Sequence, residues 1–281
     1  MSLTSTSPYT YEQRLAATQC IQGFIHSNPE GRERLLERLI AKYQQNSEAE
    51  SNLLRHILDG SDKDPYRTWF SCVILLHLLD SSDRCKEMMR AITIGDSSSG
   101  EEVITSLQQI NANLSAALIN SYDPRIAVAY LMLLSIWLYE DSLSVAEFLE
   151  EGSGIQTLVG TVAQGRDGIF VTGLSAVLLG ICVEFNSAAS SLPPYPLFFP
   201  RPITLLGDLM LTSRARLQKL ITSGVGGKDQ FIFRISQLRE SPQFRDFKEQ
   251  VTFSNHGDDE LPELWFDLGF VEFVKDNYST P

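Results

Sequence analysis

The stretch GLSAVLLGICVEFN, Gly173 to Asn186, is apolar on every side of a helix until Glu184. The two longest apolar runs of the chain, IAVAYLMLLSIWLY and IFVTGLSAVLLGICV, fall short of the ~20 residues that a membrane-spanning helix needs. A helix that is apolar all round is instead buried among other helices. Small residues in the stretch predict a close approach of those helices: Gly173, Ser175, Ala176 and Gly180. Each of the two glycines costs ~1 kcal/mol of helix propensity, so packing must outweigh this cost.

Helix start signals recur along the chain, and no alternating run is long enough to predict a sheet. An N-cap residue followed by proline at the first helical position is typical of a helix start. Two such pairs open long apolar helices: Asp64-Pro65 and Asp123-Pro124. Two others open more amphipathic helices: Asn28-Pro29 and Ser241-Pro242.

These helices belong to a larger repeated unit. A helix ending in a polar turn leads into a long apolar helix, then a short loop and a short amphipathic helix. Copies begin at 53, 114 and 155, and residues 11–43 match the later part of an earlier copy. The step from Asp123 to Asp167 is close to the ~40–47 residues of armadillo and HEAT units, and a loop insertion near GDSSSGEE, 95–102, lengthens the step from Asp64. Stacked copies would bury the apolar helices, so the sequence predicts an all-α solenoid.

The repeat pattern divides the chain into three parts. Residues 1–186 are predicted to form armadillo-like repeats, and residues 214–281 are predicted to form helices that close the array. Between them, residues 187–213 are predicted to form an irregular insertion, because its prolines forbid a continuous helix: Pro193, Pro194, Pro196, Pro200 and Pro202.

Composition excludes several classes of function. The net charge of −12 argues against a basic face for nucleic acid or a polybasic grip on lipid, and it fits a protein that binds other proteins. The N-terminus has no signal-peptide pattern. Cys20, Cys72 and Cys182 lie in apolar runs and no two cysteines form a CxxC pair, so we expect buried free thiols rather than disulfides or a metal site.

No motif predicts catalytic, cofactor-binding or metal-binding residues. The four histidines, at 26, 56, 77 and 256, lack metal-ligand spacing, and His77 is expected to be a buried or half-buried core residue. SGVGGKD, 223–229, departs from the phosphate-binding loop pattern and predicts a turn between helices. The acidic stretch 258–260 with Glu263 lacks calcium-loop spacing and predicts a solvated loop. Partner-binding residues stay unassigned.

The C-terminal stretch LPELWFDLGFVEFVKDN, 261–277, is rich in aromatic residues. Its aromatic stripe has two interpretations. The favoured one is that it caps the last repeat, because the open end of an array must be covered. The other is that it exposes a patch for a partner. Its aromatic residues are Trp265, Phe266, Phe270 and Phe273.

In order, several segments resemble the C-terminal part of the globular head of Uso-type vesicle-tethering factors, the general vesicular transport factor family. They are RLAATQCIQGFIHSNPEGRERLLERL at 14–39, SNLLRHILDGSDKDPYRTWFSCVILLHLL at 51–79, RIAVAYLMLLSIWLYEDSLSVAEFL at 125–149, GLSAVLLGICVEFN at 173–186, LQKLITS at 217–223, KDQFIFRISQLRE at 228–240 and the C-terminal stretch at 261–277. Compared with this family, the chain begins in the middle of the repeat array, has no coiled coil or acidic tail, and has residues 187–213 in place of a short connection. Gly224 replaces a residue that is usually basic.

The resemblance implies an incomplete armadillo-like array, a right-handed superhelix, that is not an enzyme. It implies a role in tethering vesicles for endoplasmic reticulum-to-Golgi and intra-Golgi transport, in the cytoplasm and peripherally on Golgi membranes. Implied partners are Rab GTPases, SNAREs and other tethering factors, and full-length members dimerise through a coiled coil. The alternative is an unrelated armadillo adaptor that binds extended peptides. Regular asparagine ladders on one helix face would favour this alternative, and the sequence lacks them. An enzyme is the third hypothesis.

Overall fold

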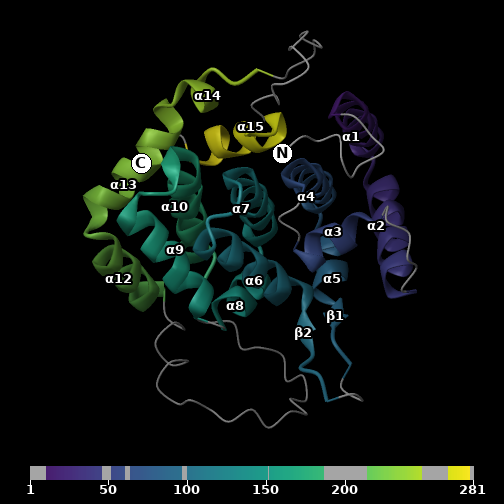
Figure 1. Cartoon of the computed structure of the whole chain (residues 1–281), viewed down its shortest axis with the longest axis horizontal. Helices are drawn as coiled ribbons and strands as arrows, with labels where there is room; N and C mark the ends of the chain where they lie inside the picture. The colour runs from purple at the N-terminus through teal and green to yellow at the C-terminus, as the bar shows by residue number, and fades with distance from the viewer. Residues whose placement is uncertain are drawn as a thin grey trace.

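The computed structural model describes residues 11–45, 52–60, 64–96, 100–150, 152–186, 214–248 and 265–278. Helices dominate this part of the chain (Figure 1). They are α1 (Tyr11–Ile25), α2 (Pro29–Gln44), α3 (Leu53–Asp59), α4 (Pro65–Leu79), α5 (Asp83–Arg90), α6 (Ser106–Ile119), α7 (Pro124–Leu138), α8 (Ser142–Glu150), α9 (Ser153–Gln164), α10 (Gly168–Glu184), α12 (Arg214–Val225), α13 (Lys228–Glu240), α14 (Pro242–Arg245) and α15 (Leu268–Asn277).

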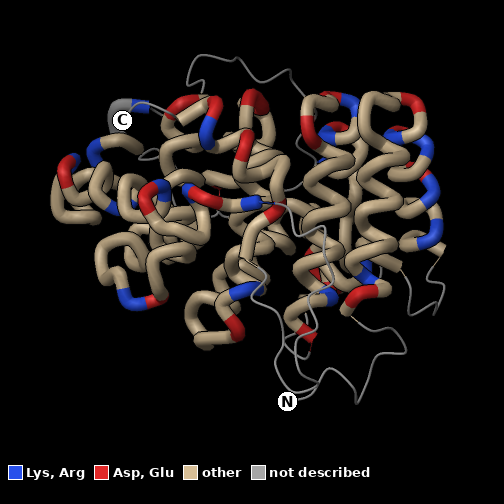
Figure 2. Tube along the Cα trace, turned by 90° about the horizontal axis from the view of Figure 1, so that it is seen from above, with Lys and Arg blue, Asp and Glu red and all other residues tan. Residues whose placement is uncertain are grey.

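The helices stack in repeating units, as the sequence predicts for an armadillo or HEAT-like solenoid. A central row runs α1, α4, α7, α10, α13, with each helix packed against the next. A second row, α3, α6, α9, α12, lies beside it in the same manner. The apolar helices α4, α7 and α10 are buried because a neighbour covers them on both sides. Charged residues lie at the turns and along the outer helix α2 (Figure 2).

Helix starts follow the predicted capping chemistry at three of four positions. Asp64 accepts a hydrogen bond from the Arg67 backbone N–H, Asp123 from Arg125 and Asn28 from Gly31. The prediction that Ser241 caps an amphipathic helix was wrong. The helix there spans only Pro242–Arg245, and the Ser241 hydroxyl donates to the Leu238 carbonyl instead of capping it.

The turn after a central helix is the same in three units. One residue closes the helix, the next has a positive φ, and a third caps the following helix. The positive-φ residues are Ser27, Ser81 and Glu140, with φ of 53°, 52° and 54°. The capping residues after them are Asn28, Ser82 and Asp141. This shared turn sets the direction of α2, α5 and α8.

In each of two units, a basic side chain donates a hydrogen bond to the C-terminal end of the next central helix. Arg32, the fourth residue of α2, donates to the carbonyl of Asp80 at the end of α4. Lys86, the fourth residue of α5, donates to the carbonyl of Tyr139 at the end of α7, at 2.6 Å. A positive charge at a helix C-terminus is favourable because the last carbonyls lack helical partners. Burial lowers the pKa of the Lys86 ammonium.

α15 does not close the far end of the array, where the favoured interpretation of the aromatic stripe put it. It lies across the central row, above α7 and between α10 and α4 (Figure 1). Phe266 and Phe270 are buried, and the Phe273 ring meets the Tyr139 ring with centroids 4.8 Å apart. The Trp69 indole N–H donates to the Trp265 carbonyl at 3.2 Å. The stripe therefore packs inward along the array: Phe266 meets Phe170 on α10 and Phe244 on α14, in the last unit, and Phe273 meets Tyr139 at the end of α7.

Small residues in α10 do not all serve close packing. A Cβ on Gly173 would lie 2.5 Å from the Cβ of Leu238 on α13, so this contact requires glycine. Gly180 has no such neighbour within 4 Å among the residues that the structure describes, and the prediction was wrong there. Cys72 and Cys182 are buried, as expected, but Cys20 is exposed because it lies on the outer side of α1.

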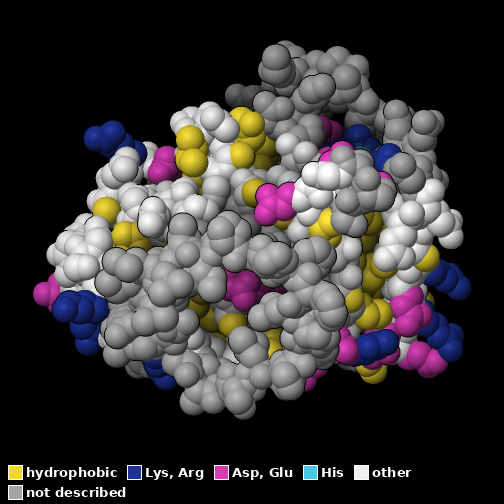
Figure 3. Space-filling view, turned by 90° about the horizontal axis from the view of Figure 1, so that it is seen from below, with side chains coloured by type: hydrophobic (Ala, Val, Ile, Leu, Met, Phe, Trp, Pro, Cys, Tyr) yellow, Lys and Arg dark blue, Asp and Glu magenta, His cyan; other side chains and the backbone are white. Residues whose placement is uncertain are grey.

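The loop insertion near 95–102 carries the strands β1 (Thr93–Ile94) and β2 (Ile104–Thr105), which pair antiparallel. No sheet was expected, and a two-residue pair is too short to show as an alternating pattern. The predicted insertion at 187–213 lies outside the described residues, so the division into 1–186, 187–213 and 214–281 stays a prediction. Within the described residues visible in Figure 3, exposed hydrophobic side chains form separate small areas.

Candidate interaction site

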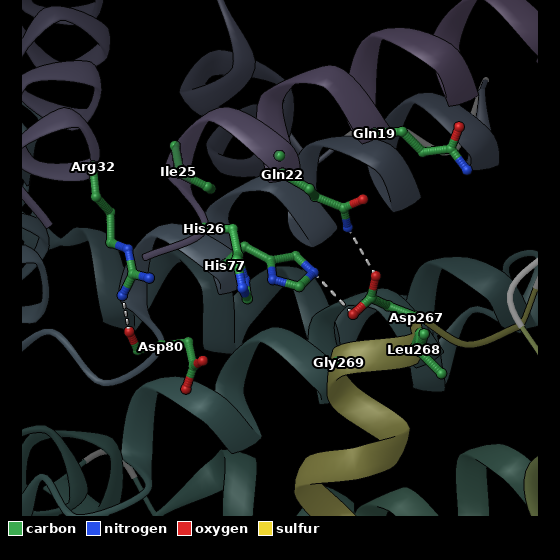
Figure 4. Close-up of a pocket in the computed structure, with 11 residues that line it drawn as sticks. Gln19, Gln22, Ile25, His26, Arg32, His77, Asp80, Asp267, Leu268 and Gly269 are labelled. Carbon is green, nitrogen blue, oxygen red and sulfur yellow. Dashed lines mark hydrogen bonds and ion pairs between the residues drawn. The ribbon is translucent and has the colours of Figure 1, made fainter. Parts of the chain in front are cut away.

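A pocket of about 290 Å³ lies where α1, the end of α4 and the start of α15 meet (Figure 4). α1 contributes Gln19 and Gln22, His26 follows α1 directly, and α2 contributes Arg32. His77 and Asp80 come from the end of α4, and Asp267 and Gly269 come from the start of α15. Most of these side chains are polar, which distinguishes the pocket from the apolar packing around it.

Asp267 fixes three elements to one another. Its Oδ1 accepts from the Phe270 backbone N–H at 3.1 Å, which caps α15. The same oxygen accepts from His77 Nε2 on α4 at 2.9 Å, and Oδ2 accepts from Gln22 Nε2 on α1 at 2.9 Å. Gly269 allows this approach, because a Cβ there would lie 2.9 Å from His77 Cε1. The Asp267 side chain is only 9% exposed, and its oxygens are largely taken up by these bonds.

Arg32 is bonded differently from other half-buried arginines of the array. Arg14 pairs with Asp64 at 2.7 Å, Arg125 with Asp123 at 2.6 Å, and Arg90 with Asp141. Arg32 donates one bond, from Nη1 to the Asp80 main-chain carbonyl, and forms no ion pair with a described residue. Its Nε is buried and has no hydrogen-bond partner. The carboxylates of Asp80 and Asp267 line the same pocket as this guanidinium.

The polar groups of the pocket gather around one carboxylate. His77 is engaged with Asp267, and among the described residues that line the pocket none is serine, threonine, cysteine or lysine. His26 is exposed at the rim. The enzyme hypothesis required a convergent polar cluster, and the pocket contains one.

The structure places most of the histidines and the stretch 223–229 that the sequence suggested as candidate site residues. His77 is half-buried, as expected, and shares the pocket with His26, whereas His56 lies on α3. Residues 223–229 form the end of α12, a turn at Gly226 and Gly227, and the start of α13, as predicted. Residues 256, 258–260 and 263 lie outside the described residues.

The described residues contain no group of three or more His, Cys, Asp or Glu side chains that could hold a metal ion. No helix in the same ranges is long and apolar enough to cross a membrane.

The pocket could not be predicted from local patterns, because its residues come from distant parts of the chain; the bonded pair Gln22 and Asp267 is 245 positions apart. One signal was available. Asp267 precedes the apolar run LGFVEF, which is the pattern of an N-cap. That signal predicts the start of α15 but not the helices that α15 meets.

Comparisons with known proteins agree on one family. Residues 1–198 and 208–280 match the family described as Uso1 / p115 like vesicle tethering protein, head region. The unmatched residues 199–207 fall within the predicted insertion. The intracellular protein transport protein USO1 of Saccharomyces cerevisiae is 26% identical over 222 residues, which are 76% of this chain and 11% of the yeast protein. The general vesicular transport factor p115 of Homo sapiens is 27% identical over 271 residues, or 94% of this chain and 25% of the human protein.

Solved structures agree in fold. The structure titled "Crystal structure of Uso1-2" superposes with a TM-score of 0.76 at 21% sequence identity. The match covers 99% of this chain and 39% of that one. A second Uso1 structure, Uso1-1, superposes with a TM-score of 0.73 over 94% of this chain. The chain thus spans a quarter or less of the length of these curated relatives and folds as part of the solved heads does.

Proposed function

The chain belongs to the Uso1/p115-like vesicle tethering protein family, within its head region, and from that membership we propose that it acts as a vesicle-tethering head fragment. The proposed role is docking of vesicles in endoplasmic reticulum-to-Golgi and intra-Golgi transport through protein–protein contacts. The observation that carries the proposal is the match to the head region over residues 1–198 and 208–280.

The stacked helices support a role in binding proteins. Arg14 on α1 forms an ion pair with Asp64 at the start of α4, so these neighbouring units are joined by a polar bond as well as by packing. A solenoid presents an extended surface, which is how helical repeat proteins bind their partners. We therefore propose that the chain is not an enzyme.

Further parts of the proposal come from the family. We propose that the chain is cytoplasmic and associates peripherally with Golgi membranes through proteins. Proposed partners are a Rab GTPase, SNAREs or other tethering factors. Dimerisation is proposed for the full-length relatives and not assigned to a surface of this chain.

Golgi membranes provide the test. Purified chain is incubated with isolated Golgi membranes, with membranes whose surface proteins have been removed by trypsin, and with protein-free liposomes. We expect sedimentation with the intact membranes alone. Equal binding to liposomes, or no binding to intact membranes, would refute a protein-mediated tethering role. A fluorescently tagged chain in cells should likewise concentrate at the Golgi, and a uniform cytosolic or nuclear distribution would argue against the proposal.

The alternative of an unrelated armadillo adaptor is set aside, because the family match includes the repeats and the C-terminal helix together.

A further inference from the structure

We propose that α15 is a displaceable strap, and that the surface beneath it binds an amphipathic helix of a partner protein in its place. The strap comprises residues 265–278, which are α15 and the residues next to it. The surface beneath it is formed by α4, α7 and α10, at the side chains of Trp69, His77, Tyr139 and Phe170. The inference rests on how α15 is attached and not on the tethering role, so its test is independent of the membrane experiment.

The described solenoid is packed together without the strap. Each central helix packs on the next, and the second row packs on the central row, through contacts that include no residue of α15. The backbone of α15 approaches the described helices less closely than neighbouring central helices approach one another. Large side chains bridge the gap instead, as the Phe273 ring does to the Tyr139 ring. Release of the strap would therefore uncover a surface without separating one unit from the next.

The side chains that hold the strap show what kind of partner the surface fits. Four apolar side chains of the strap are buried: Phe266, Phe270, Val271 and Val274. Those on α15 itself recur at spacings of three and four positions, which is how an amphipathic helix docks in a groove. The Phe170 ring, whose centroid is 5.0 Å from that of Phe266, belongs to the surface that receives them. Exposed aromatic surface of this kind favours the binding of another apolar helix face.

Polar bonds at the two ends of the strap define the partner further. Asp267 accepts hydrogen bonds from side chains on α1 and α4, and the Tyr139 hydroxyl donates to Asn277 Oδ1 at 2.6 Å. The donors of these bonds belong to the solenoid, so they remain in place for a new helix when the strap leaves. We therefore expect the partner helix to carry an aspartate at its N-cap and an aromatic residue three positions later, as Asp267 and Phe270 are arranged in the strap.

Several of the bonds that attach the strap are open to water. The hydrogen bond from Tyr139 to Asn277 is exposed, and so is the bond from Lys275 Nζ to the Arg245 carbonyl at 3.0 Å. The pocket of about 290 Å³ lies against the start of α15, so packing there is incomplete (Figure 4). A short helix held in this way opens at a lower free energy than the core of the array unfolds.

Binding of a strap peptide to the full chain tests the proposal. The fluorescein-labelled peptide WFDLGFVEFVKDNY, residues 265–278, is titrated with the chain and followed by fluorescence anisotropy. In the native chain its own strap competes, so the apparent affinity is reduced to the fraction of chains that are open. Asp267→Ala in the chain weakens the strap but leaves the surface beneath it unchanged, so this variant should bind the peptide about tenfold more tightly. Glu272→Ala removes an exposed carboxylate from the same helix and should change the affinity by less than about twofold.

The same substitution placed in the peptide has the opposite effect, which a mere loss of stability does not predict. A peptide with Asp267→Ala should bind the Asp267→Ala chain less tightly than the native peptide does, because it lacks the N-cap and its bonds to α1 and α4. Asn277→Ala in the chain covers the case in which Asp267→Ala fails to fold, and it should also tighten binding of the native peptide. Equal binding by the native chain and both variants, or no binding to any of them, would overturn the proposal. A concentration-dependent dimer of the native chain in sedimentation would identify a second copy as the occupant and overturn the assignment to a partner protein.

Discussion

Replacing Gly173 with alanine isolates the contact between α10 and α13. An added Cβ would lie 2.5 Å from the Leu238 Cβ and 3.2 Å from its Cγ and Cδ2. Contacts under 3.0 Å between such atoms force the helices apart, and overpacking of this kind costs about 1–3 kcal/mol. Alanine also gains about 0.5–1 kcal/mol of helix propensity over glycine, so we expect a net destabilisation of about 1 kcal/mol.

Gly180→Ala is the matched control, because it lies in the same helix with nothing within 4 Å. It gains the same propensity without the contact and should stabilise the chain by about 0.5–1 kcal/mol. The propensity gain cancels when the two variants are compared, so their difference measures the contact alone, about 1–3 kcal/mol. Each 1 kcal/mol corresponds to a change in melting temperature of roughly 2–4 °C.

Urea unfolding followed by far-ultraviolet circular dichroism measures both variants. A further variant sharpens the test. Leu238→Ala removes Cγ and Cδ2 but leaves the Cβ that is nearest to Gly173, so it should not rescue Gly173→Ala. If Gly173→Ala proves as stable as Gly180→Ala, the close approach of α10 and α13 is not present in the protein and the reasoning fails.

Three further outcomes are expected. Asp267→Ala should remove the N-cap of α15 and two side-chain hydrogen bonds. Backbone amides of α15 should then exchange hydrogen faster than in the native chain, while those of α12 stay unchanged. Equal exchange of the α15 amides in the native chain and in Asp267→Ala would contradict the role given to Asp267. Native protein should react with a thiol reagent at Cys20 first, because the other three cysteines are buried and burial raises the pKa of Cys72 and Cys182; rapid reaction of more than one thiol would contradict the packing. Burial raises the pKa of Asp64, but hydrogen bonds from the Arg14 side chain and from the Arg67 backbone N–H lower it by more. The pKa of Asp64 in the folded chain is therefore below its ordinary value of 3.8. Its stabilisation is therefore present above pH 3.8 and lost as the pH falls through the lower folded-state value, so acid unfolding of Asp64→Asn should be shallower than that of the native chain.

Local sequence patterns predicted the fold because each helix of a solenoid meets mainly its neighbours in the chain. Asp64 and Asp123 mark helix starts through bonds to residues two or three positions away, and the apolar run from Gly173 marks a buried helix by itself. The same locality explains where prediction failed. Whether Cys20 is covered depends on what packs outside α1, which an apolar run cannot reveal.

The candidate site was beyond local patterns. The position of α15 depends on Asp267 meeting Gln22 and His77, whose separations along the chain are 245 and 190 residues. An aromatic stripe indicates that a helix is buried but not which surface receives it. In the sequence, Arg32 is one charge among several on an amphipathic helix, and its bond to the Asp80 carbonyl exists only in the folded chain.

The bond between Gln22 and Asp267 has a consequence for synthesis on the ribosome. At about 5–20 residues per second, the 245 residues between them take roughly 12–50 s to be made. During this time the unit that contains α1 can fold on α4, while the surface that later receives α15 stays uncovered. We therefore expect that face to stay exposed on the nascent array until α15 has been made, so the docking of α15 is a late step in the folding of these helices.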